Sequence, residues 1–145
     1  MKKIIPTLLL TIILLTNCNN FDSTDSSESN ITERSPEELK MDLKTQEQSA
    51  PTEYLTADGT YHENFWGDKL KISCTITNKA TLATFKDVVV QVTYYSKTKT
   101  ELGTNEYTIY EMFPPNSSNI IEMKIDNYKD VNSIGLGVIN AISAN

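Results

Sequence analysis

The single histidine of the chain lies among acidic side chains, which makes it a candidate for acid–base chemistry. His62 is followed directly by Glu63, and Asp58 and Asp68 lie close by in the sequence. A histidine paired with a carboxylate can act as a general acid or base near neutral pH. However, no neighbouring residue is marked by its context as a nucleophile, and there is no second histidine to complete a site. We therefore expect an exposed histidine on a loop or edge strand, no catalytic residues and no enzyme activity.

Two further groups of acidic residues are candidates for a catalytic pair or a metal site. Glu101, Glu106 and Glu111 are spaced by five residues, so in a strand alternate members point to opposite faces. Asp126 and Asp130 flank a short segment that could form a cation-binding loop, but calcium sites usually have a denser group of oxygen ligands. We expect these carboxylates to be solvated, and we predict no bound metal and no cofactor.

The N-terminal segment has the pattern of an export signal. Lys2 and Lys3 precede the apolar stretch Ile4–Leu15. As a helix this stretch spans about 18 Å, short of the roughly 30 Å of a membrane's hydrocarbon core. A basic start followed by a short apolar stretch is typical of a signal peptide rather than of a transmembrane helix.

The end of this stretch, Leu15-Thr16-Asn17-Cys18, resembles a bacterial lipobox, although Asn17 stands where a smaller residue is usual. The resemblance implies that residues 1–17 are a lipoprotein signal peptide and that Cys18 is the lipid attachment site. The alternative is an ordinary secretory signal with a chance cysteine. Because each buried CH₂ contributes about 0.8 kcal/mol, several acyl chains would anchor the protein firmly without a spanning helix. We expect a protein of the bacterial cell envelope, at the inner membrane, the outer membrane or the cell surface.

The charge balance excludes one class of partner. The chain has 13 Lys and Arg against 19 Asp and Glu, a net charge of −6. Loss of Lys2 and Lys3 with the signal leaves 11 basic against 19 acidic residues, a net charge of −8. Binding to the phosphates of nucleic acid requires a positively charged surface. We therefore predict no nucleic-acid partner. We expect contact with the membrane through the N-terminal lipid, and with another envelope protein.

Residues 18–50 have the composition of a disordered tether. Asn, Ser, Thr and acidic residues dominate, and the few apolar side chains cannot bury enough surface to offset the entropy of the chain. Within this segment, Ser35-Pro36 is typical of a helix start, with a capping residue followed by proline at the first helical position. A short helix from Pro36 to about Gln46 is therefore the alternative for the second half of the segment.

Residues 51–145 are predicted to fold as one domain, because a two-residue hydrophobic period begins there. In Lys69–Asn78 the apolar residues alternate with polar ones, as in a strand with one buried face. Similar patterns occupy Val88–Tyr95, Glu101–Met112, Asn119–Ile125 and Ser133–Ile142, and one or two short strands are expected within Glu53–Trp66. Six to seven short strands separated by turns indicate an all-β, immunoglobulin-like antiparallel β-sandwich.

The strand patterns place the second cysteine and separate two adjacent tyrosines. Cys74 shares the apolar face of its strand, so we expect a buried packing residue without redox or nucleophilic function. Tyr94 and Tyr95 must point to opposite faces, which makes Tyr95 a candidate surface ring. With Trp66 and Tyr110 it forms our candidate set for surface recognition, because exposed aromatic rings are favoured at interfaces. The alternative is that these rings cap the ends of the core.

Four segments follow the pattern of a known family: Thr75–Lys79 (TITNK), Phe85–Tyr95 (FKDVVVQVTYY), Leu102–Thr104 (LGT) and Pro115–Ser118 (PNSS). The chain here resembles the FxLYD-type and related immunoglobulin-like domains of exported bacterial proteins. It departs from their pattern at Cys74, Ser96 and Asn116, where Gly, Asp and Gly are usual. The resemblance implies a module for display or interaction, and the family has no shared catalytic residues to transfer.

Two functions follow from these observations. The first is a lipid-anchored lipoprotein of the cell envelope whose sandwich domain is a non-catalytic interaction or scaffold module. The alternative is a small envelope enzyme or inhibitor that acts through the loops of the sandwich. An exposed apolar patch would favour the first, and a pocket with a polar cluster the second.

Overall fold

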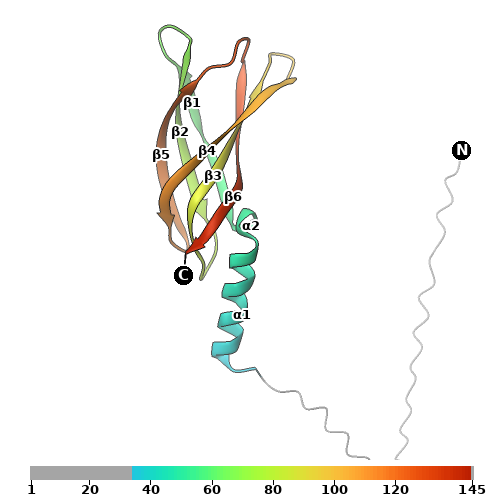
Figure 1. The fold of residues 1–145 in the computed structure, drawn as a ribbon, viewed down its shortest axis with the longest axis vertical. Coiled ribbons are helices and arrows are strands. Elements are labelled where there is room, and N and C mark those ends of the chain that lie inside the picture. Colours follow the sequence, from blue (N-terminus) through green and yellow to red (C-terminus); the bar gives the residue numbers. More distant parts are fainter. Residues whose placement is uncertain (1–33, 145) are drawn as a thin grey trace, which may run out of the picture. The chain divides into compact units, whose positions relative to one another are not determined.

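The computed structural model describes residues 34–144 and consists mainly of antiparallel β-strands (Figure 1). The predicted signal peptide, Cys18 and the first part of the predicted tether lie outside the described residues. Six strands are present in the described part of the chain: β1 (Leu55–Glu63), β2 (Lys69–Asn78), β3 (Thr84–Tyr95), β4 (Glu101–Phe113), β5 (Ser117–Asp126) and β6 (Ser133–Ala144). Each lies where the sequence predicts a strand, which confirms the all-β expectation.

The six strands form two three-stranded antiparallel sheets that enclose one core. One sheet has the order β1-β2-β5 and the other the order β4-β3-β6. The central strands β2 and β3 alternate between buried and half-buried positions along almost their whole length. This two-residue period buries one face of each sheet against the other, so the domain is a β-sandwich.

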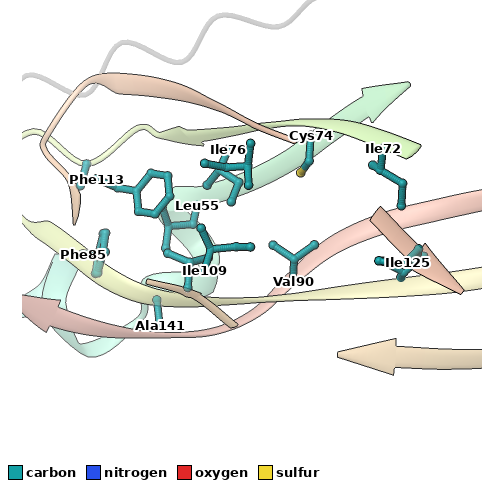
Figure 2. Close-up of a cluster of buried hydrophobic side chains, with 14 of the residues drawn as sticks. Leu55, Ile72, Cys74, Ile76, Phe85, Val90, Ile109, Phe113, Ile125 and Ala141 are labelled. Carbon is teal, nitrogen blue, oxygen red and sulfur yellow. The ribbon is translucent and has the colours of Figure 1, made fainter. Parts of the chain in front are cut away.

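The core is made by the inward faces of the central strands together with side chains of their neighbours. Ile72, Cys74 and Ile76 on β2 are fully buried, and Figure 2 shows Cys74 pointing toward Val90 on the facing strand. Phe113 at the end of β4 is also fully buried. The predicted placement of Cys74 as a packing residue is confirmed.

Irregular backbone occurs where the strands turn or bulge. Asn116 has a φ of 53° in the turn between β4 and β5, a left-handed conformation that asparagine tolerates. Asp87 has a φ of 51° and lies where the register between β3 and β4 shifts. A bulge of this kind bends a strand locally and increases its twist.

Helix α1 (Pro36–Ser49) corrects part of the predicted tether. Ser35 Oγ accepts a hydrogen bond from the Glu38 backbone N–H at 3.2 Å, and Glu38 Oε2 accepts one from the Ser35 N–H at 2.8 Å. This reciprocal capping box, with proline at the first helical position, stabilises the helix start. The helix continues through Ser49, past the expected end near Gln46, so disorder throughout residues 18–50 was the wrong expectation for residues 36–49.

The physical reason for this longer helix lies at Glu47, which attaches α1 to the loop between β2 and β3. Glu47 Oε1 accepts hydrogen bonds from the Thr81 N–H at 2.8 Å and the Thr81 hydroxyl at 2.7 Å. Its Oε2 accepts from the N–H groups of Leu82 and Ala83, both at 2.8 Å. Only 2% of Glu47 is exposed. Burial alone raises the pKa of this carboxyl, but the hydrogen bonds outweigh burial and the resulting pKa lies below its ordinary value.

A second buried polar side chain connects the same loop to the end of β4. Asn78 is fully buried, and its Nδ2 donates to the carbonyl oxygens of Ala83, Phe113 and Pro114 at 2.9, 2.9 and 3.0 Å. Its Oδ1 accepts from the Ala80 N–H at 2.9 Å. One side chain thus provides hydrogen-bond partners for backbone groups on both sides, and those of Ala80, Ala83 and Phe113 are buried.

The short helix α2 (Pro51–Tyr54) connects α1 to β1 and lies against the end of β6 (Figure 1). Ser143 Oγ on β6 donates to the Gln48 carbonyl oxygen at 3.0 Å. Among residues 34–144, no helix is long and apolar enough to cross a membrane.

Candidate functional site

Two of the most exposed large apolar side chains of the described residues are adjacent aromatic rings in the loop between β1 and β2. Phe65 and Trp66 are 92% and 82% exposed. Their ring centroids lie 5.1 Å apart with an interplanar angle of 89°, an edge-to-face contact. We call Phe65 and Trp66 together the aromatic tip. Trp66 was one of the residues predicted for surface recognition, whereas Phe65 was not singled out.

The loop that carries the aromatic tip is held by its own hydrogen bonds. The Asn64 N–H donates to the Lys69 carbonyl oxygen at 2.9 Å, and the Gly67 N–H donates to the Asn64 carbonyl oxygen at 3.0 Å. The two aromatic residues therefore occupy the central positions of a β-turn, and Gly67 has the left-handed φ of 71° that glycine adopts without strain. Asn64 Nδ2 also donates to Asp68 Oδ1 at 2.6 Å.

A neighbouring segment after β5 supports this loop from the side. Asn127 Nδ2 donates to the Gly67 carbonyl oxygen at 3.0 Å, and the Asn127 N–H donates to the Asp68 carbonyl oxygen at 2.9 Å. Lys69 forms an ion pair with Asp126, and this hydrogen bond and charge raise the pKa of Lys69. The backbone of the loop is thus fixed at both sides, so the loop that carries the two rings needs little further ordering on binding.

The other two predicted recognition residues lie apart from one another. Tyr95 is half-buried at the end of β3, where it pairs with Glu101 at the start of β4. Tyr110 is 82% exposed and lies nine residues farther along β4, roughly 30 Å away at about 3.3 Å per residue. Tyr94 points inward, is fully buried and stacks on Tyr128, which confirms the predicted opposition of the two tyrosines. Tyr95 and Tyr110 therefore cannot belong to one compact site.

The acidic candidates do not converge either. His62 is exposed on the edge strand β1, as expected, and Glu101, Glu106 and Glu111 are all exposed on β4. Asp126 faces Lys69 rather than Asp130. Within residues 34–144 no cluster of three or more histidine, cysteine, aspartate or glutamate side chains has the arrangement of a metal site.

Cys74 has the properties of a packing residue rather than a nucleophile. Burial, with a smaller contribution from the charge of Asp58, raises the pKa of its thiol to about 11. Very little reactive thiolate is present at neutral pH in such a site.

No family model, curated protein or solved structure matches this chain. The resemblance to FxLYD-type domains therefore stays a prediction. The aromatic tip itself was only partly predicted from the sequence, because the bracing residue Asn127 is sixty residues away. The local signal that could have found the turn is Asn64-Phe65-Trp66-Gly67, an asparagine and a glycine three residues apart between two strands.

Proposed function

We propose that the protein is a lipid-anchored lipoprotein of the bacterial cell envelope whose immunoglobulin-like sandwich is a non-catalytic interaction module. The observation that carries the proposal is the aromatic tip. Two large rings are almost fully exposed on a loop that hydrogen bonds hold in place. Aromatic side chains on a rigid support are the residues that dominate binding energy at protein interfaces.

The size of the aromatic tip indicates the strength of contact it supports. Each ring offers about 150–200 Å² of surface, and burial contributes roughly 25 cal/mol per Å², so the pair contributes about 8–10 kcal/mol before the costs of association. Association removes a large part of such a sum. The aromatic tip therefore suits a weak or transient contact with another envelope protein.

The surroundings of the aromatic tip indicate the chemistry of its partner. Glu63 and Asp68 are exposed on either side of the two rings. A complementary surface would have an apolar pocket for the rings and basic residues around its rim.

The strand order is consistent with the immunoglobulin-like part of the proposal. In immunoglobulin-like domains the first, second and fifth strands share one sheet, and the strand that follows the second begins the facing sheet. The orders β1-β2-β5 and β4-β3-β6 meet both conditions.

The experiment is a pull-down from solubilised envelope, with the full chain as bait and mass spectrometry of the captured proteins. The double variant Phe65→Ser/Trp66→Ser should lose a partner that the parent chain captures. Tyr110→Ser, an equally exposed aromatic on β4, is the matched control and should retain it. Equal capture by the parent and the double variant would contradict an interaction through the aromatic tip.

Membrane attachment is tested separately. Cys18→Ser should move the protein from the membrane fraction to the soluble fraction and abolish incorporation of an acyl label. Continued sedimentation with membranes and an unchanged label would show that Cys18 is not the anchor.

A further inference from the structure

Strand β6 is an edge strand with an unusual composition. It ends the sheet of order β4-β3-β6, so only β3 pairs with it among the described residues. Over its twelve residues, SIGLGVINAISA, it has no charged side chain and no proline. Natural edge strands usually have charges, prolines or bulges that prevent pairing with another chain.

The other three edge strands of the sandwich are protected by charge. Strand β1 contains Asp58 and Glu63, and β4 contains three exposed glutamates. Strand β5 contains Glu122, Lys124 and Asp126. Like charges across an edge oppose its pairing with a second copy. Among the described residues, β6 is thus the one edge at which two copies of this acidic domain can pair without repulsion between like charges.

The part of β6 with regular pairing is a stretch of six half-buried residues. Ser133–Val138 pair with Tyr95–Val90 of β3 without a shift, and the register becomes irregular only after Val138. Both ends of β6 are fixed elsewhere: Asn132 accepts a hydrogen bond from the Tyr61 hydroxyl at 2.9 Å, and Ser143 bonds to Gln48. Strand β1 of the facing sheet lies close to β6 but forms no ladder with it, so among the described residues the outer backbone groups of this stretch have no strand partner.

The two faces of this stretch differ in a way that suits pairing with itself. Ile134, Leu136 and Val138 pack against the core, whereas Gly135 and Gly137 occupy the opposite face. A Cβ built at Gly137 has no atom within 4 Å. Residues directly opposite in an antiparallel pair lie on the same face. A pair centred on Leu136 therefore places Ile134 opposite Val138 of the second copy, and glycine opposite glycine.

We infer that the free edge formed by Ser133–Val138 of β6 binds the same edge of a second copy of this chain. The two strands pair antiparallel across a twofold axis at Leu136, which joins the two sheets into one continuous sheet of six strands. A contact of this size corresponds to a weak, reversible dimer. The dimer does not use the aromatic tip. The inference can therefore fail while the proposed function stands, and the proposed function can fail while the dimer forms.

The first test measures the mass of the full chain in density-matched detergent by sedimentation equilibrium over a range of concentrations. We expect a reversible equilibrium between monomer and dimer. The variant Ser133→Lys/Gly137→Lys adds two charges to the outer face of β6, where Gly137 has open space, and should raise the dimer dissociation constant at least tenfold. The matched control Thr104→Lys/Thr108→Lys adds the same charges at the same spacing on the other edge strand, β4, and should change it less than twofold.

A cysteine at the proposed axis gives a second, independent measurement. Leu136→Cys places two thiols directly opposite each other, so oxidation should produce a disulfide-linked dimer, whereas the buried Cys74 should not react. Thr104→Cys is the control and should remain monomeric. A chain that is monomeric at all concentrations, a dimer insensitive to the β6 lysines, or cross-linking at residue 104 instead of 136 would each overturn the inference. Phe65→Ser/Trp66→Ser should dimerise like the parent chain.

Discussion

Replacement of Glu47 by glutamine should detach helix α1 from the sandwich. Glutamine has nearly the shape of glutamate but keeps one acceptor oxygen, which can serve two of the four donors at Thr81, Leu82 and Ala83. The side-chain NH₂ group then faces the other two donors. A hydrogen bond to a charged group contributes about 1.5–3 kcal/mol. Thr81 is exposed, so water can replace part of the lost hydrogen bonding. Glu47→Gln should therefore lower the free energy of docking α1 on the sandwich by about 2–4 kcal/mol.

The assay is amide hydrogen exchange of the parent and variant, measured residue by residue. A loss of about 2–4 kcal/mol corresponds to a roughly 30- to 900-fold decrease in protection for the amides of α1 and of Thr81–Ala83. The core strand β2 should keep its protection, because its hydrogen bonds do not involve Glu47. Glu53→Gln, an exposed carboxylate on α2, is the matched control. Protection of α1 within twofold of the parent would refute the reasoning.

The same contact sets a pH dependence. The folded state holds the pKa of Glu47 below its ordinary value of 4.5, so the unfolded chain binds a proton more readily than the folded one. The contribution of Glu47 to stability is therefore complete above pH 4.5 and is lost as the pH falls through the lowered pKa. Glu47→Gln should remove this part of the acid sensitivity of α1.

Three further predictions concern the core and the beginning of the folded domain. The Cys74 thiol, with its pKa raised to about 11, should react with a thiol reagent only after unfolding, and rapid labelling of the native protein would show that it is accessible. Asn78→Ala should lower the free energy of unfolding by about 2–4 kcal/mol in chemical denaturation, because the buried backbone groups of Ala80, Ala83 and Phe113 lose a hydrogen-bond partner. Asn132→Ala, at an exposed position, is the control and should change it little. Limited proteolysis should leave a fragment that begins near Ser35, and a resistant core that begins at Pro51 would mean that α1 is not docked.

The sequence was sufficient for the strands because each strand buries one face. Alternation along Lys69–Asn78 predicted both the bounds of β2 and the burial of Cys74, and the same rule separated Tyr94 from Tyr95. Local signals also indicated the start of α1, since a capping serine and a proline act within one turn.

Features that depend on distant partners could not be predicted in this way. Glu47 is an acidic residue in a polar segment. It is a buried acceptor only because the loop at Thr81, thirty-four residues later in the chain, packs against it. Asn78 resembles an ordinary turn residue until the end of β4 packs beside it. The hydrophobic pattern also shows which residues of β6 face inward, but not that β6 lies at an edge, because strand order depends on the whole fold.

The position of the aromatic tip in the chain has a mechanical consequence. Helices α1 and α2, strand β1 and the loop with Trp66 follow one another without interruption. A pull between the N-terminal end of α1 and a partner bound at Trp66 is therefore carried mainly along the covalent backbone of β1, and the ladders between strands bear little of it. The first part to yield is α1 before Glu47, whose eleven residues lengthen by about 21 Å when a helix becomes extended. Beyond this point the four hydrogen bonds of Glu47 hold the helix, so part of the load then passes into the loop at Thr81–Ala83.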